Sequence, residues 1–371
     1  MARFRPAALF PLRTIASAAS AVAVLASCSG SGGGSTSDTA PVPTVDASKI
    51  AAACFQGGTT PELHIGSGFA GADWNDPHVL KVGGEYWMYA SSNLGFAPTP
   101  PSPVQIYRFT STDAVSWTLN PAAPVLTVIA GQWDQGGNET PAVVSFGSKY
   151  HMFWTGYPDA WPNLNAFNFR IGHATSTDGI AWTKDATYLL GPSGVSGDFA
   201  QYIVGEPGPV VFNNTLFLYF TAVGVDAGLA ASLQVIGVMT FDGTTWSAPA
   251  LVFKPDQTVY PRASNWVGYS TPNAAVIGGK VHVFVDVAND HGNDTWTQEA
   301  LHHAYSSDGL TGWAQDAAPI RGLTDFAWTK REIRSPGAYV DGTTLRLYFA
   351  GDDLLNTGAW GIGQMACSLA P

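Results

Sequence analysis

Acidic residues recur beside prolines that return at a fixed interval along the chain. The prolines at positions 77, 141, 207, 272 and 336 are about 65 residues apart. A fixed period of this kind indicates an array of repeated structural units. One equivalent position near the proline is assigned to Asp76, Glu139, Glu206, Thr271 and Ser335, with Arg334 just before the last. Units arranged around an axis would bring the three acids together at one central site.

Three neighbouring carboxylates have a definite chemical use. Like charges at short range raise the pKa of one carboxyl group and leave another ionised, and a general acid paired with a base or nucleophile needs this division. Glycoside hydrolysis uses such a pair, about 5–5.5 Å apart for retention and about 6.5–9.5 Å apart for inversion. The sequence does not contain this separation, so the stereochemistry is open. For each acid taken alone, a cap on the turn before the proline is the alternative.

A second sequence pattern, with the same period, predicts the strands that position these acids. Four turns precede a tryptophan and carry the aspartates Asp113, Asp178, Asp242 and Asp308, which we interpret as structural. In the first repeat we expect strands at 79–82, 86–90, 104–111 and 116–119. Tight hairpin turns recur at Gly83-Gly84, Gly147-Ser148, Asn213-Asn214, Gly278-Gly279 and Asp341-Gly342.

Four-stranded antiparallel units in radial array form a β-propeller. The predicted fold class is therefore all-β, a five-bladed β-propeller of four-stranded antiparallel blades. The fifth repeat lacks an outer strand of its own, and residues near 62–65 are expected to supply it.

The strand starts and the long loops are predicted to share one face, which is where a scaffold carries its function. Aromatic rings suit stacking on sugars, and packing in the core is the alternative for each of them. The candidate substrate-binding residues are Trp74, Asn75, His78, Asn138, Trp154, Thr271 and Arg334.

Composition excludes several classes of partner and cofactor. The 371 residues carry a formal charge of −11, whereas nucleic-acid binding needs a basic face. An oligosaccharide or polysaccharide is the expected partner, and a monomer is the expected state. No phosphate loop, nucleotide motif, zinc signature or Gly-x-Ser-x-Gly elbow occurs, so no cofactor and no metal site is predicted. Bound structural calcium is left open.

The N-terminus carries export signals. Arg3, Arg5 and Arg13 precede an apolar run over 15–26 that is too short for an ordinary membrane helix. The end of this run, up to Cys28, resembles a bacterial lipobox, which implies cleavage before Cys28 and lipid on its thiol. A plain secretory signal is the alternative. The expected domains are a signal peptide over 1–27, a Ser/Gly/Pro-rich tether over 28–49 and the propeller over 50–371, anchored by lipid outside the cytoplasm.

Two further cysteines, Cys54 and Cys367, lie at opposite ends of the folded region. The first and last units of a ring are neighbours, and disulfides persist in an export compartment. We therefore predict a disulfide between them that closes the ring, with a stabilisation of roughly 3–5 kcal/mol on the chain-entropy model. Two buried free thiols are the alternative.

The motif Trp74-Asn75-Asp76-Pro77, the three acids and the Ser-x-Asp-Gly turns resemble the five-bladed glycoside hydrolases of family 43 (arabinanases and β-xylosidases) and family 32 (fructan hydrolases). The resemblance covers about residues 62–370. It implies that Asp76 is the base or nucleophile, Glu206 the general acid and Glu139 the stabilising residue. Both groups have Asp where this chain has Glu139, and the arabinanase group has its acid in blade four, where this chain has Ser270-Thr271. We therefore expect a divergent member.

The resulting prediction is a glycoside hydrolase acting on a furanoside- or xylose-type glycan. A propeller lipoprotein that binds glycans without cleaving them is one alternative. A glycoside phosphorylase is another, and it would need cations beside the acids, for which the chain offers Arg334 and the pair Lys330-Arg331. The glycan, its linkage and exo or endo action are open.

Overall fold

The computed structural model describes residues 45–63, 73–92, 103–159, 164–229, 231–292, 296–352 and 360–371. The expected signal peptide and the lipidated Cys28 lie outside the described residues, so export and anchoring stay predictions. Within the described part, no helix is long and apolar enough to span a membrane.

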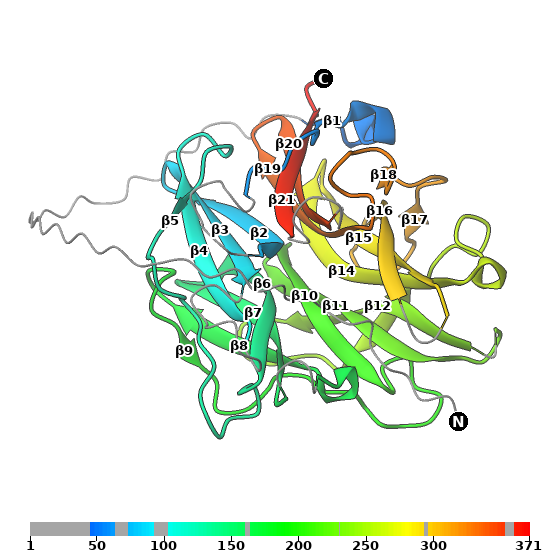
Figure 1. The fold of residues 1–371 in the computed structure, drawn as a ribbon, viewed down its shortest axis with the longest axis horizontal. Helices are drawn as coiled ribbons and strands as arrows, with labels where there is room; N and C mark the ends of the chain where they lie inside the picture. The colour runs from blue at the N-terminus through cyan, green and yellow to red at the C-terminus, as the bar shows by residue number, and fades with distance from the viewer. Residues whose placement is uncertain are drawn as a thin grey trace, which may run out of the picture.

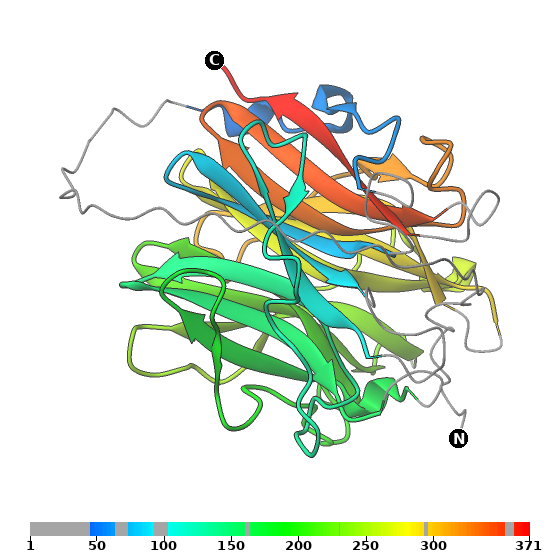
Figure 2. The same ribbon diagram turned by 60° about the vertical axis from the view of Figure 1, so that its left-hand side comes forward.

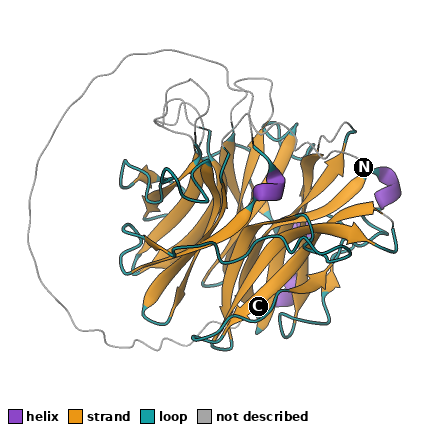
Figure 3. Cartoon of the chain, turned by 90° about the horizontal axis from the view of Figure 1, so that it is seen from below, coloured by secondary structure: helices purple, strands orange, loops and turns teal. Residues whose placement is uncertain are grey.

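Strands make up nearly all of the regular structure, and the only helices in the described residues are short 3-10 turns (Figure 3). The strands are β1 (Gln56–Gly57), β2 (Asn75–Val82), β3 (Glu85–Ser92), β4 (Gln105–Ser111), β5 (Thr118–Leu119), β6 (Gly137–Phe146), β7 (Lys149–Tyr157), β8 (Arg170–Ser176), β9 (Thr183–Lys184), β10 (Ile203–Phe212), β11 (Thr215–Asp226), β12 (Ala231–Phe241), β13 (Ala250–Phe253), β14 (Trp266–Ile277), β15 (Lys280–Asp290), β16 (Trp296–Ser306), β17 (Ala314–Gln315), β18 (Arg321–Gly322), β19 (Glu332–Asp341), β20 (Thr344–Asp352) and β21 (Gly361–Ser368). The 3-10 turns are η1 (Ala47–Lys49), η2 (Ala52–Cys54), η3 (Ala166–Asn168) and η4 (Arg262–Ser264).

The strands form antiparallel sheets that follow the order of the chain. Three sheets have four strands each, in the orders β2-β3-β4-β5, β6-β7-β8-β9 and β1-β21-β20-β19. The strands from β10 to β18 form a nine-stranded sheet, in which a single parallel pair, Gln234 with Gly268, joins β12 to β14. The prediction of an all-β fold with four-stranded antiparallel sheets is confirmed.

The strands that carry the repeated prolines lie side by side around the centre. These are β2, β6, β10, β14 and β19, and Figure 1 labels the first four near the middle of the molecule and β19 above them. Each contacts the next, and β19 in turn contacts β2, so their order of contact closes on itself. The residues at the starts of these strands are thereby brought together from distant parts of the chain.

The tight turns that the sequence predicts lie between the first and second strands of each repeat. Four of them occupy the predicted pairs of residues. The last turn is Gly342-Thr343, one residue later than predicted, because Asp341 still pairs with Thr344 at the end of the ladder. The predicted strands of the first repeat are confirmed, although β2 begins earlier, at Asn75.

The turn aspartates are structural, as predicted. Asp178 Oδ1 accepts the backbone N–H groups of Ile180 and Ala181 at 2.8 and 2.9 Å. Asp113, Asp242 and Asp308 accept the corresponding pairs of N–H groups in their own turns. These carboxylates therefore cap turns and lie apart from the proline-bearing strand starts.

The N-terminal and C-terminal segments of the described chain are joined. Strand β1 pairs with β21, where Gln56 is opposite Ala366, and Leu63 forms a further bridge to Ile362. The outer strand of the last repeat thus comes from the N-terminal segment, through β1 at 56–57 and through Leu63 within the predicted 62–65. Figure 2 shows this blue segment beside the red strand β21.

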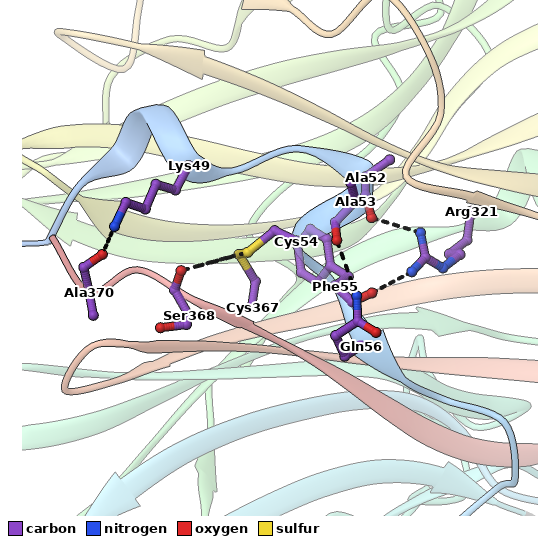
Figure 4. Close-up of a disulfide and its surroundings, with 10 residues drawn as sticks. All are labelled: Lys49, Ala52, Ala53, Cys54, Phe55, Gln56, Arg321, Cys367, Ser368 and Ala370. Atoms are coloured by element: carbon purple, nitrogen blue, oxygen red, sulfur yellow. Dashed lines mark hydrogen bonds between the residues drawn. A yellow bond between two sulfur atoms is a disulfide. The ribbon is translucent and has the colours of Figure 1, made fainter.

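A disulfide links Cys54 to Cys367 across this junction, which confirms the predicted pairing (Figure 4). Arg321 donates to the carbonyl oxygens of Ala52 and Phe55 beside it. The folded contacts begin before the predicted boundary at residue 50, because the Asp46 N–H donates to the Leu369 carbonyl at 3.0 Å.

Candidate active site

The residue before each repeated proline has a left-handed backbone conformation. The φ angles are 56° at Asp76, 51° at Thr140, 53° at Glu206, 46° at Thr271 and 53° at Ser335. In each repeat the pairing between the first and second strands also shifts at this point, which marks a β-bulge. We call these five positions the bulge positions.

The bulges correct the predicted equivalence of Glu139. Thr140, and not Glu139, occupies the bulge position of the second repeat. Glu139 lies one residue earlier, pairs with Thr155 and corresponds to Arg334, which pairs with Ala350. The offset is visible in the spacing of the sequence: Glu139 is two residues before its proline, whereas Asp76 and Glu206 directly precede theirs.

Each bulge from the second repeat to the fifth is held by a polar side chain on the second strand of the preceding repeat. The N–H of Thr140 donates to Ser91 Oγ at 2.9 Å, and the N–H of Glu206 donates to Thr155 Oγ1 at 2.6 Å. The N–H of Thr271 likewise donates to Thr221 Oγ1 at 2.9 Å. In the fifth repeat the acceptor is a carboxylate, Asp286 Oδ2, at 2.8 Å from the Ser335 nitrogen. The strand starts are thereby fixed relative to one another.

Asp76 is held by donors from two neighbouring strands. Its Oδ1 accepts the Ser335 hydroxyl at 2.7 Å, and its Oδ2 accepts the Thr140 N–H at 3.3 Å. The Arg334 guanidinium lies 3.8 Å from Oδ1. Asn75 supports the turn by accepting the Asp76 N–H at 2.9 Å. These contacts fix the orientation of the Asp76 side chain between β6 and β19.

Glu206 and Glu139 lie in environments that favour the protonated form. Burial raises the pKa of Glu206 to about 7, the charge of Asp286 adds to this, and Arg334 opposes it. Burial raises the pKa of Glu139 to about 8, with a further contribution from Asp76. Glu206 accepts the Thr271 N–H at 3.1 Å and keeps part of its surface exposed.

Arg334 is the cation at the centre of a cluster of acids. This cluster, which we call the carboxylate group, consists of Asp76, Glu139, Glu206, Asp286 and Glu332. Arg334 is buried, lies 3.7 Å from Glu332 as well as 3.8 Å from Asp76, and stacks over Trp360 at 5.1 Å from the ring centroid. Burial acts against its charge, but the surrounding carboxylates, Asp76 foremost, raise its pKa overall. It therefore stays positively charged and partly neutralises the acids.

Tyr157 contacts the same group through its hydroxyl, which donates to Glu139 Oε2 at 3.4 Å. Its ring is buried and stacks on Phe169 at 5.2 Å. The phenol thus fixes one oxygen of Glu139 instead of offering an open stacking surface.

Several predicted substrate-binding residues are placed elsewhere. His78 is buried, and both of its ring nitrogens are engaged: Asn273 Nδ2 lies 2.8 Å from Nδ1, and the Val143 carbonyl lies 2.7 Å from Nε2. The amide N–H donates to Nδ1, so the Nε2–H donates to the carbonyl. The prediction of a substrate contact for His78 is therefore wrong, and the ring joins β2, β6 and β14.

The predicted aromatic contacts also belong to the core. Trp74 is fully buried and packs edge-on against Tyr107 and Phe109. Trp154 is buried and stacks on Trp133 at 6.0 Å. Neither ring is available for stacking on a sugar.

Asn138 precedes Glu139 and is fully buried. Its backbone N–H donates to the Val104 carbonyl at 2.9 Å, and its side-chain amide has no hydrogen-bond partner among the described residues. Thr271 and Arg334, in contrast, lie in the carboxylate group as predicted.

Two acids of the group, Asp286 and Glu332, are absent from the sequence-based candidates. Asp286 lies within the apolar run of β15, and Glu332 starts β19. The signal for Asp286 was present: the cross-strand partner of Ser270 is Asp286, whereas the equivalent partners in other repeats are Ser91, Thr155, Thr221 and Ala350. Comparing the second strands of the repeats, and not only the first, would have found it.

Among the described residues, no three His, Cys, Asp or Glu side chains are grouped so as to hold a metal ion. His302 and His303 point to opposite faces of β16, toward Tyr260 and His282 respectively.

Comparison with known proteins identifies the fold. No family of sequences matches the chain, and no curated protein matches it. A solved glycoside hydrolase is 12% identical, with a TM-score of 0.63 over 80% of this chain and 87% of that one. A thermostable family-43 glycoside hydrolase is 16% identical, with a TM-score of 0.57 over 79% and 88%.

An α-L-arabinofuranosidase from Podospora anserina is 14% identical, with a TM-score of 0.58 over 88% of this chain and 98% of that one. At these identities the likeness concerns the fold. The chain therefore has the fold of these solved glycoside hydrolases.

Proposed function

We propose that the protein is a glycoside hydrolase built on a five-bladed propeller, in which Asp76 and Glu206 are the reacting carboxylates. The observation that carries the proposal is the contrast between their environments. Asp76 accepts two hydrogen bonds and faces Arg334, whereas the pKa of Glu206 is raised to about 7 by burial and by Asp286. Two carboxyl groups in such different environments can divide the roles of acid and of base or nucleophile.

In the proposed reaction, the Glu206 carboxyl group gives its proton to the glycosidic oxygen as the bond to the anomeric carbon breaks. The Asp76 carboxylate either attacks that carbon directly or removes a proton from the attacking water. The anomer of the first product, followed by proton NMR, distinguishes these routes. Glu139, whose Oε2 accepts the Tyr157 hydroxyl, lies beside the pair, and Arg334 balances the charge of the acids.

The proposed substrate is a furanoside- or xylose-type glycan, either a soluble oligosaccharide or a polysaccharide. The fold shared with an α-L-arabinofuranosidase and a family-43 glycoside hydrolase supports this class. The net charge of −11 favours a neutral glycan over an anionic one.

Sugar release from a polysaccharide panel and from 4-nitrophenyl furanosides and xylosides tests the proposal. We expect Asp76→Ala to reduce kcat/KM by about 10³-fold or more on every active substrate, because no other group replaces the base or nucleophile. Glu206→Ala should cost about 10²–10⁴-fold on polysaccharide but far less on the 4-nitrophenyl glycosides, whose leaving group needs no proton.

Asp242→Asn, in a surface turn, serves as the control and should leave the rate unchanged. If Glu139→Ala and not Glu206→Ala shows the dependence on leaving group, Glu139 is the acid and the assignment is wrong. No release by the wild type, with polysaccharide binding retained, would support the binding protein instead. A rate that depends on added inorganic phosphate would identify a phosphorylase.

A further inference from the structure

Asp286 places an acidic side chain at a position that other repeats fill with a small side chain. Burial raises the pKa of Asp286, and Arg334 opposes this. The equivalent residues are Ser91, Thr155 and Thr221, each of which accepts the N–H of the next bulge through a hydroxyl, and Ala350. A hydroxyl therefore suffices to hold the backbone. Burying a carboxylate there costs free energy that the scaffold does not require.

Both oxygens of Asp286 are engaged within the protein, and the side chain has no exposed surface. Oδ2 accepts the Ser335 N–H at 2.8 Å, and Oδ1 accepts the Ser270 hydroxyl. Ser335 in turn donates its hydroxyl to Asp76 Oδ1 at 2.7 Å. A continuous hydrogen-bonded path thus runs from Asp286 through Ser335 to Asp76.

Asp286 also lies near Glu206, because it accepts the Ser270 hydroxyl while Glu206 accepts the N–H of the neighbouring Thr271. After burial, Asp286 is the largest influence that raises the pKa of Glu206, and Arg334 opposes it. Glu139 faces Glu206 as well, and Glu332 faces Asp286. A threonine at this position would supply the hydrogen bond to Ser335 without this influence.

We propose that Asp286 is a positioning residue for both reacting carboxylates: it orients Asp76 through Ser335 and keeps the proton on Glu206. The inference rests on the proposed function, because that function makes Glu206 the proton donor. Asp286 does not touch substrate, and it acts only through these two groups.

The pH dependence of kcat/KM for Asp286→Asn and Asp286→Thr tests this role. The basic limb of the profile follows loss of the proton from Glu206, so both variants should move it to lower pH by about one unit. Both new side chains still accept the Ser335 N–H, so the maximal rate should stay within about tenfold of the wild type.

Asp286→Ala removes the acceptor as well as the charge. It should show the same shift and a further fall in kcat of about 10–100-fold, with KM little changed, because Asp76 loses its fixed orientation. The control is Asp316→Asn, at an aspartate that faces His303, and it should leave the basic limb in place. A purely structural Asp286 would lower thermal stability in its variants with no shift of the limb, which would overturn the inference.

A readout without substrate separates this inference from the proposed function. The carboxyl carbon of Glu206, observed by ¹³C NMR and assigned with Glu206→Gln, should titrate about one pH unit lower in Asp286→Asn than in the wild type. An unchanged midpoint overturns the inference whether or not hydrolysis is found. A shifted midpoint in a protein that hydrolyses nothing supports the link to Glu206 and contradicts the proposed function.

Discussion

At the scale of single residues, a strained backbone conformation occurs at Asp76 and Glu206, two acids of the candidate site. Non-glycine residues seldom adopt φ near +50°, and a proline directly after them narrows the choice further. Here all five bulge positions adopt it, so the strain belongs to the repeated architecture. Asp76 and Glu206 use this architecture, because the bulge places their carboxyl groups among those of neighbouring repeats.

Glu139→Gln should stabilise the protein at alkaline pH. The pKa of Glu139 is raised from 4.5 to about 8, mainly by burial. Its folded-state pKa lies above its unfolded value, so its contribution to stability is present below pH 4.5 and is lost as the pH rises to 8. Glutamine cannot ionise, so the variant should be more stable at pH 8.5 by on the order of 2–4 kcal/mol.

Urea unfolding at pH 4.5 and pH 8.5 measures this difference. At pH 4.5 the two proteins should be nearly equal. Equal stability at both pH values would show that the protein accommodates the ionised Glu139 without cost, contrary to its assigned environment.

At the scale of elements, a chain of hydrogen bonds joins four of the proline-bearing strands. Asn273 on β14 donates to His78 on β2, and its Oδ1 accepts the Ala338 N–H on β19 at 2.9 Å. His78 continues the link to Val143 on β6. This short chain of hydrogen bonds spans four strands that are distant in sequence.

Asn273→Ala should lower the free energy of unfolding by about 2–4 kcal/mol, because it leaves the Ala338 N–H and His78 Nδ1 buried without partners. Asn138→Ala is the matched comparison, since that buried amide has no partner among the described residues to leave behind, and it should cost at least about 1 kcal/mol less. Urea unfolding of both variants gives the difference. Equal losses would show that the link contributes only by filling space.

The elements also show what the sequence could predict. The spacing of prolines and tight turns predicted the strands and hairpins, because these signals are local and repeat. The pairing of Asp76 with Glu206 stays a prediction. Glu139 was placed one position wrong, because it was matched by its acidic side chain, whereas the proline that follows each bulge marks Thr140 as the equivalent residue. His78 and Trp154 were misassigned because their neighbours come from other strands or turns.

At the scale of the whole molecule, closure depends on contacts between distant parts of the chain. The disulfide joins residues 313 apart in sequence, and β1 and Leu63 pair with β21 beside it. A link over so long a loop restricts the unfolded chain strongly.

Replacing Cys54 and Cys367 with serine should lower the free energy of unfolding by up to about 5 kcal/mol. The carboxylate group lies on other strands, so kcat at 25 °C should be unchanged. Thermal unfolding with and without reductant tests this, with the double variant as the control that reductant should not affect. A wild type that loses no stability on reduction would show that β1 and its neighbours close the molecule alone.

Asp46 and Leu369 lie near the two ends of the described chain and are joined by a hydrogen bond. The site therefore does not depend on which repeat comes first in the sequence. The five proline-bearing strands contact one another in a closed order. A circular permutant opened at the turn Gly278-Gly279, with the former ends joined by a linker, would contain every contact described for Asp76, Glu206 and Asp286. The order of the repeats along the chain can therefore change while the arrangement of residues around the site stays the same.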